Sequence, residues 1–231
     1  MIGGTPLGDC MKLDPDLYAY LWEDPDENNC NSYLIAGEKP LLIDPGHLRH
    51  VDRLFGLIAR DGLDPDQIGL VIATHSHPDH FEGLEAFRNK RVKMAMARDE
   101  ERYPSESGRL LFEMMQQPLP EFRIDFYLGE GHLQVGEKAF DVFLTPGHSP
   151  GSLSIYWPER QALFTGDVIF YGGIGRTDFT EGDPGLLGES IQRLTRLDAE
   201  WILPGHGEIV RGREAVLQNF QFIRESFYPY L

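Results

Sequence analysis

The chain has 231 residues, which is enough for one sizeable α/β domain, and its composition is typical of a soluble globular protein. Its 21 basic and 37 acidic residues give a net charge of −16, which argues against non-specific binding to nucleic acid or to anionic lipid. Met1–Lys12 lacks a charged segment followed by an apolar run, and no stretch is long enough to span a membrane. We therefore expect no signal peptide and a cytoplasmic protein. Cys10 and Cys30 have neither metal-ligand nor disulfide spacing, so free thiols are expected.

The first half of the chain alternates apolar, β-branched runs with turns and one clear helical pattern. Apolar residues from Leu48 to Ile58 recur at helical spacing, and Asp61-Gly62 ends the predicted helix near Arg60. Strands are predicted at residues 17–22, 30–36, 41–44, 68–73 and 93–97.

The second half continues this alternation. Asp183 is the predicted N-cap of a helix with Pro184 in its first turn, and a closing helix is expected through Val216 and Phe227. Strands are predicted at residues 122–128, 140–145, 152–157, 162–165 and 201–203. The pattern indicates the α/β class, and the absence of a low-complexity linker favours a single domain over residues 1–231.

Residues 98–122 do not fit the alternation. Tyr103-Pro104 interrupts the segment, two prolines end it, and a short helical pattern lies between them. One interpretation is a lid insertion that contributes a substrate wall; the other is an ordinary packing helix. The candidate wall residues are Phe112, Met114, Met115 and Phe122.

The most informative stretch is Thr-His-Ser-His-Pro-Asp-His at residues 74–80, which follows a predicted buried strand and precedes a helical pattern. Such a loop lies at the carboxyl end of a strand, where open α/β sheets bind ligands. His75 and His77 can point at one metal ion, whereas Asp79 and His80 turn toward a second position. Imidazole and carboxylate are good ligands for zinc and other first-row divalent metals, so the stretch predicts a metal site.

This stretch resembles the signature of the metallo-β-lactamase superfamily, and further stretches fit the family pattern in the same order. They are Leu42-Ile43-Asp44-Pro45-Gly46 upstream, and Thr145-Pro146-Gly147-His148-Ser149-Pro150-Gly151, Phe164-Thr165-Gly166-Asp167 and Leu203-Pro204-Gly205-His206-Gly207 downstream. The resemblance runs from about Asn29 to the end of the chain, and the ordered set is more specific than any single motif. It implies a four-layer αββα sandwich with a metal site at one edge, between two sheets.

The resemblance also implies a ligand set for two metal ions. His75, His77 and His148 would hold the first ion, Asp79, His80 and His206 the second, and Asp167 would bridge them. Asp44 would orient the loops that carry the ligands. His47, His50 and His132 match no family position and are expected at the surface.

A hydrolase is the activity that the resemblance implies. Two divalent ions, with Zn²⁺ the best fit and Fe²⁺ or a mixed iron–zinc pair as alternatives, would lower the pKa of a shared water to about 7 and stabilise the oxyanion. The bridging hydroxide would be the nucleophile, and Asp79 would orient it or accept its proton. No serine or cysteine nucleophile is then needed.

Gly-Gly-Ile-Gly-Arg-Thr-Asp-Phe at residues 172–179 narrows the family. It resembles short glyoxalase II-like thioesterases and also persulfide dioxygenases. For Arg176 we favour a pairing with Asp178 over direct contact with substrate. A full glyoxalase II has a long helical carboxyl-terminal region that grips glutathione, whereas this chain ends 25 residues after His206. Glutathione specificity is therefore not carried over.

The leading hypothesis is a dinuclear zinc thioesterase acting on a small molecule such as an S-acylglutathione, because a thiolate leaves without a proton donor. The alternative is an iron-dependent persulfide dioxygenase, in which two histidines and one aspartate would bind a single iron. A lactonase is the third hypothesis. An antibiotic-hydrolysing role is less expected, because Asp167 stands in a region where those enzymes offer a cysteine ligand.

Overall fold

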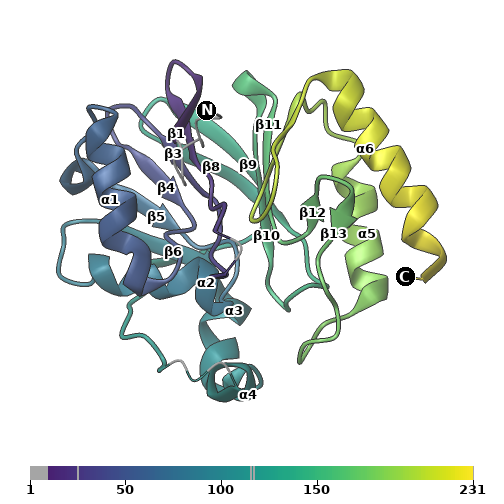
Figure 1. The fold of residues 1–231 in the computed structure, drawn as a ribbon, viewed down its shortest axis with the longest axis horizontal. Helices are drawn as coiled ribbons and strands as arrows, with labels where there is room; N and C mark the ends of the chain where they lie inside the picture. The colour runs from purple at the N-terminus through teal and green to yellow at the C-terminus, as the bar shows by residue number, and fades with distance from the viewer. Residues whose placement is uncertain (1–9, 25, 115, 117, 231) are drawn as a thin grey trace, which may run out of the picture.

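The computed structural model describes residues 10–24, 26–114, 116 and 118–230. Figure 1 shows two sheets face to face, with helix α1 outside one of them and helices α5 and α6 outside the other. The first sheet has seven strands in the order β1 to β7, antiparallel from β1 to β4 and parallel from β4 to β7. Its strands are β1 Cys10–Asp14, β2 Leu17–Tyr20, β3 Ser32–Ile35, β4 Leu41–Ile43, β5 Leu70–Ile72, β6 Lys93–Ala97 and β7 Phe126–Leu128.

The second sheet has six strands in the order β15-β14-β11-β10-β9-β8, all antiparallel except the β11–β14 pair. Its strands are β8 Gly131–Val135, β9 Lys138–Leu144, β10 Leu153–Trp157, β11 Ala162–Gly166, β14 Trp201–Pro204 and β15 Val210–Arg211. A separate small hairpin joins β12 Ile169–Phe170 to β13 Gly173–Ile174.

Helices cover the outer faces and connect the strands. The α-helices are α1 Val51–Arg60, α2 Pro78–Phe81, α3 Arg98–Arg102, α4 Arg109–Met114, α5 Pro184–Leu194 and α6 Arg213–Ser226. The 3₁₀ helices are η1 Leu48–His50, η2 Pro65–Gln67, η3 Glu82–Phe87, η4 Tyr103–Ser105, η5 Pro158–Arg160 and η6 Tyr228–Tyr230. Within the described ranges, no helix combines the length and apolar character needed to cross a membrane.

Three separate hydrophobic clusters account for the layers. The central cluster, which includes Ile43, Trp157 and Phe164, lies between the two sheets. An outer cluster packs the other face of the first sheet against α1, and a third packs the second sheet against α5 and α6. Because the inner strands of each sheet are buried on both faces, strands such as β4, β5, β10 and β11 are largely apolar runs. The structure confirms the predicted four-layer αββα arrangement.

Local differences from the predicted elements have local causes. The helical pattern after residue 77 becomes a single turn, α2, followed by η3, because Gly83 packs against the Pro45–Gly46 loop and donates to the Gly46 carbonyl oxygen at 2.7 Å. Strand β8 was not predicted because most of its residues are exposed and form no apolar run. The N-cap prediction is confirmed: the Asp183 carboxylate accepts from Leu186 N at 2.9 Å.

Candidate metal centre

Five segments from both sheets bring the predicted ligands together. His75 and His77 lie on the loop after β5, Asp79 and His80 on α2, His148 after β9, Asp167 after β11 and His206 after β14. Their donor atoms form three overlapping groups, within each of which all atoms lie within 4.8 Å of one another. Close approach needs a glycine at 205, because a Cβ there would overlap the carboxylate of Asp167 and the ring of His80.

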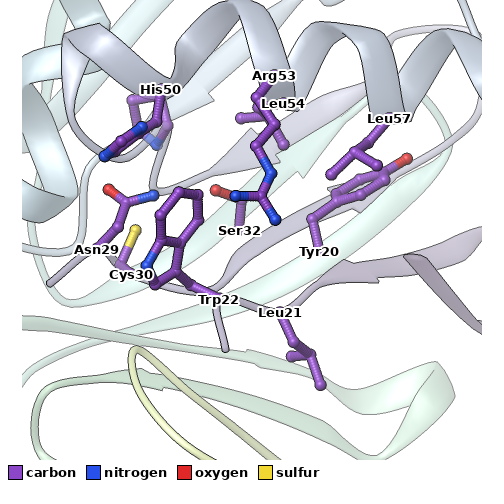
Figure 2. Close-up of a pocket in the computed structure, with 11 residues that line it drawn as sticks. Tyr20, Leu21, Trp22, Asn29, Cys30, Ser32, His50, Arg53, Leu54 and Leu57 are labelled. Carbon is purple, nitrogen blue, oxygen red and sulfur yellow. The ribbon is translucent and has the colours of Figure 1, made fainter. Parts of the chain in front are cut away.

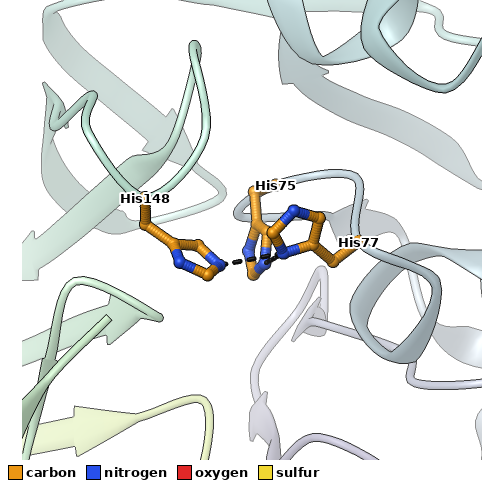
Figure 3. Close-up of side chains that lie close together, drawn as sticks. All are labelled: His75, His77 and His148. Atoms are coloured by element: carbon orange, nitrogen blue, oxygen red, sulfur yellow. Dashed lines mark hydrogen bonds between the residues drawn. The ribbon is translucent and has the colours of Figure 1, made fainter. Parts of the chain in front are cut away.

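The first cluster consists of three imidazoles on two facing loops (Figure 3). His77 Nδ1 lies 3.1 Å from His75 Nε2 and 2.9 Å from His148 Nε2. The opposite ring nitrogens identify the tautomers. His148 Nδ1 donates to the Arg176 carbonyl oxygen at 2.8 Å, and His75 Nδ1 lies 3.1 Å from Thr74 Oγ1. Thr74 Oγ1 already donates to Asp44, so His75 Nδ1 is the donor in that contact.

These tautomers turn two Nε2 lone pairs toward His77 Nδ1. Burial, reinforced by His80 and His77, lowers the pKa of His75 well below its usual value. Burial and then His148 lower the pKa of His77 to about 3, against opposing contributions from Asp79 and Asp167. Among the described residues, His77 Nε2 is buried without a partner. Converging neutral nitrogens of this kind fit a metal cation, which would accept all three lone pairs.

The second cluster mixes imidazole and carboxylate. His80 Nε2 lies 3.2 Å from His206 Nε2 and 3.2 Å from Asp167 Oδ1, and Asp79 Oδ2 lies 3.1 Å from His206 Nε2. Burial opposes charge on His80, but Asp167, Asp44 and Asp79 outweigh it and raise the His80 pKa. Burial would raise the pKa of Asp79, but His80 and His206 hold it well below its usual value. A divalent cation would replace the protons shared in this cluster.

Asp167 lies between the two clusters. Its Oδ2 is 3.5 Å from His148 Nε2 and 3.5 Å from His206 Nε2. Burial would raise the pKa of its carboxyl, but His206 and His80 together hold that pKa below the usual range. This position fits the bridging role expected for Asp167, with the carboxylate available to a cation on either side.

Asp44 lies behind the ligands and touches the loops of both clusters. Its carboxylate accepts from Thr74 N at 2.7 Å, from Thr74 Oγ1 at 2.8 Å and from His80 Nδ1 at 3.0 Å. Its backbone has a φ of +54°, a left-handed conformation that is costly for a residue other than glycine. This backbone conformation places the carboxylate where it fixes the orientation of His80 and supports His75 through Thr74.

A cavity of about 400 Å³ opens over the clusters. Besides ligand residues and Pro78, it is lined by Asn28, Leu111, Phe170, Arg176 and Phe179. Asn28 Nδ2 donates to Asp79 Oδ2 at 2.6 Å, and the Phe179 ring lies 5.2 Å from that of His77. Sequence reasoning did not select Asn28, Leu111, Phe170 or Phe179 as site residues. Phe179 closes the 172–179 motif, which could have pointed to it, whereas the acidic turn before Asn28 carried no such signal.

The expected pairing of Arg176 is present. Its guanidinium donates to the Asp178 carboxylate at 2.8 and 2.7 Å and stacks 4.5 Å from the centre of the Phe179 ring. Arg176 also lines the cavity, so its guanidinium borders the cavity while paired with Asp178.

The predicted substrate wall is largely wrong. Phe112 is 1% exposed and packs edge-on against Phe81, as does the half-buried Phe122, so both belong to the outer core. Met114 is 73% exposed and is not among the residues lining the cavity, whereas Leu111 is. Met115 lies outside the described residues. The short helix α4 turns one face into the core, and its sequence alone did not indicate which face.

The surface prediction also fails for His47. It is 1% exposed, and its ring lies 2.7 Å from Glu82 in a buried pair. His132 is exposed as expected, with Asp141 as its partner.

His50 is half-buried beside Trp22, next to a small pocket of about 20 Å³ below α1 (Figure 2). That pocket has room for about one water molecule.

Cys30 also lines this pocket, as a buried free cysteine. Burial is the largest of the effects that raise the pKa of its thiol. A buried thiol of this kind is unreactive, which agrees with the expected free cysteine.

Comparison with known proteins places this geometry in a family. The sequence profile of the Metallo-beta-lactamase superfamily matches residues 25–206. "Probable metallo-hydrolase YqgX" of Bacillus subtilis (strain 168) is 33% identical over 184 residues, covering 76% of this chain and 83% of that protein. "Hydroxyacylglutathione hydrolase GloC" of Haemophilus influenzae is 30% identical over 194 residues, covering 78% of this chain and 86% of that protein.

A solved structure supports the same assignment. The crystal structure of TTHA1623 in a di-iron-bound form is 30% identical in sequence and superimposes with a TM-score of 0.68, over 87% of this chain and 95% of that one. The profile match, the two sheets and the two ligand clusters agree. The chain belongs to the metallo-beta-lactamase superfamily, as a metallo-hydrolase whose histidine and aspartate clusters could bind a dinuclear metal site.

Proposed function

We propose that this metallo-hydrolase is a thioester hydrolase of the glyoxalase II type. One observation carries the proposal. Among the cavity-lining residues that the structure describes, every side chain able to act as a general acid near neutral pH belongs to a ligand cluster. The remaining polar groups, the Asn28 amide and the Arg176 guanidinium, are not acids in that range. No acid thus stands apart from the ligand clusters to protonate a leaving group, which suits a thiolate far better than the alkoxide of a lactone or the nitrogen of an amide.

Seven side chains would hold two divalent ions. The first cluster would take one ion and the second cluster the other, with Asp167 between them. When bound, the ions supply Lewis acidity and make water a nucleophile at neutral pH. Asn28 donates to Asp79 and so orients the carboxylate that we propose as proton acceptor. Leu111, Phe170 and Phe179 offer an apolar surface for the acyl group of a small-molecule substrate.

Zinc is the proposed metal, since imidazole and carboxylate ligands suit it. Iron is the alternative, favoured by the di-iron form of the related solved structure. The name of the Haemophilus influenzae relative supports a hydroxyacyl thioester of glutathione as the first substrate to test. A persulfide dioxygenase needs one iron, and the separate second cluster of Asp79, His80 and His206 favours two metals instead. The cytoplasmic location stays a prediction.

The test is a substrate panel with measured metal content. Zinc-loaded protein is assayed with S-lactoylglutathione, with lactoyl-coenzyme A and with a γ-lactone, and free thiol release is followed in the first two. We expect thiol release that stops on chelation and returns with Zn²⁺, and little lactone opening. No thiol release by protein holding two zinc ions would contradict the proposal. Oxygen uptake with glutathione persulfide, by protein holding a single iron, would support the dioxygenase.

A further inference from the structure

Glu100 on α3 is a fully buried carboxylate that none of the family motifs includes. Its Oε2 accepts from Ser76 N at 2.8 Å and from Ser76 Oγ at 2.6 Å. Its Oε1 accepts from Ser149 Oγ at 2.7 Å and from Gly151 N at 2.7 Å. Each oxygen therefore accepts from one loop only. The separation of the two loops is thus tied to the fixed distance between the two oxygens of one carboxylate.

These two loops carry the first ligand cluster. Ser76 stands between His75 and His77, and Ser149 directly follows His148. The loops come from different sheets, one after β5 and the other after β9, and Figure 3 shows their imidazoles facing one another. A small change in loop separation would move His148 relative to the other two nitrogens. Glu100 is placed to hold that separation constant.

The surroundings are built to fit this carboxylate. A Cβ on Gly151 would lie 3.1 Å from Glu100 Cγ and 3.1 Å from Ala97 Cβ, so a glycine lets this loop close against the start of α3. Ser149 Oγ is also 2.6 Å from Ser152 Oγ, which fixes the hydroxyl that donates to Glu100. Burying a carboxylate is costly unless donors satisfy it, and four donors from the ligand loops do so here.

The second cluster is held in a different way. Asn31 Nδ2 donates to the carbonyl oxygens of Pro204 at 3.1 Å and Gly207 at 3.0 Å, on either side of His206. No hydrogen bond links Glu100 to this loop among the described contacts of the carboxylate. Asp44 contacts the loops of both clusters, but Glu100 supports only the first and Asn31 only the second in their described hydrogen bonds, which makes the effect of Glu100 selective.

We propose that Glu100 is a positioning residue that sets the spacing of the first cluster and thereby its affinity for metal, with little influence on the second cluster. The inference rests on the two-metal site proposed above. It predicts that weakening the Glu100 contacts lowers metal affinity at one cluster only. A residue that merely stabilises the fold would not produce such a selective loss.

The experiment measures zinc affinity in two backgrounds, each with one cluster disabled. His206→Ala leaves the first cluster complete, and His148→Ala leaves the second. Glu100→Gln keeps the size of the side chain but leaves one carbonyl oxygen for four donors. We expect it to weaken zinc binding by about 10- to 100-fold in the His206→Ala background, the usual range for partners behind metal ligands. In the His148→Ala background the change should stay below about twofold.

Two further variants keep the test decisive. Glu101→Gln makes the same change one residue along α3, where the carboxylate bonds only the exposed Tyr127 hydroxyl among its described contacts, and should leave both affinities unchanged. Ser149→Ala removes one donor to Glu100 without leaving a carboxylate unsupported. If Glu100→Gln does not fold, Ser149→Ala should still weaken the first cluster alone, by about three- to tenfold.

The outcomes separate this inference from the proposed function. Equal weakening of both clusters, or no weakening of the first by either variant, would overturn the role of Glu100. If the His206→Ala protein with Glu100 intact bound no zinc, the two-metal site would be wrong and the inference would fall with it. Absence of thioesterase activity would leave the zinc measurements, and hence the role of Glu100, intact.

Discussion

The two ligand clusters lie side by side, but different interactions hold their side chains together. The first consists of three buried imidazoles and no carboxylate, and the pKa values of His75 and His77 are lowered, so no pairing of opposite charges within the cluster holds its nitrogens together. The second pairs His80 and His206, both with raised pKa values, with the carboxylates of Asp79 and Asp167. In the second cluster, protonated imidazoles partly balance the negative charge of the carboxylates. The first cluster relies instead on the rigidity of its loops.

Preorganisation is needed most where the ligands do not attract one another. Oppositely charged groups attract one another, and this attraction helps to hold the second cluster together. Neutral imidazoles have no such attraction, and the Nε2 lone pairs of His75 and His148 both face His77 Nδ1. The first cluster accordingly depends on supports outside itself, which Asp44, Thr74 and Glu100 provide.

Asp167→Ala should have the largest effect, because this carboxylate alone among the described ones touches both clusters. We expect loss of at least one metal ion and a fall in thioester turnover of about 1000-fold, equivalent to roughly 4 kcal/mol of transition-state stabilisation. Elemental analysis and thiol release measure the two effects, and circular dichroism should report an unchanged fold. Asp66→Ala, at an exposed aspartate paired with Lys90, is the matched control. Full metal content with a normal rate would refute the bridge.

Asn31→Ala should affect the second cluster alone. The change removes the donor to the Pro204 and Gly207 carbonyl oxygens and the acceptor of Trp22 N. We expect zinc affinity at the second cluster to fall by about tenfold, with the first cluster unaffected. The measurement uses the same single-cluster backgrounds as Glu100→Gln and should give the mirror-image result. A loss at the first cluster would mean that the two supports are not independent.

The sequence predicted the first-sheet ligands on physical grounds, since His75, His77, Asp79 and His80 crowd one loop after a buried strand. His148, Asp167 and His206 arrive from the second sheet, and only the ordered family motifs linked them to the first four. The apolar runs predicted only the α/β class; the four layers, which the three core clusters show, were implied by the family resemblance.

What sequence reasoning missed depends on contacts between distant segments. Glu100 looks like an ordinary residue of a charged helix, and its burial follows from Gly151 and Ser149, about 50 positions later. His47 is expected at the surface because it matches no family position, and nothing in the sequence indicates its buried partner Glu82, which lies 35 residues away. A charged or imidazole side chain gives no sequence signal that its partner will reach it after folding.

The weakest expected effect concerns substrate selection, for which the structure favours Leu111 over the candidate wall residue Met114. Leu111 is half-buried and lines the cavity, whereas Met114 is 73% exposed and does not. Leu111→Ala should lower kcat/KM by about three- to tenfold for long acyl thioesters and less for short ones, because a longer chain loses more apolar contact. Met114→Ala, on the same helix, is the control and should change neither. Metal content should stay the same in both variants, since neither side chain contacts a ligand cluster in its described contacts. An equal loss across all chain lengths, with a lowered Tm, would place Leu111 in the packing of α4 instead of the substrate site.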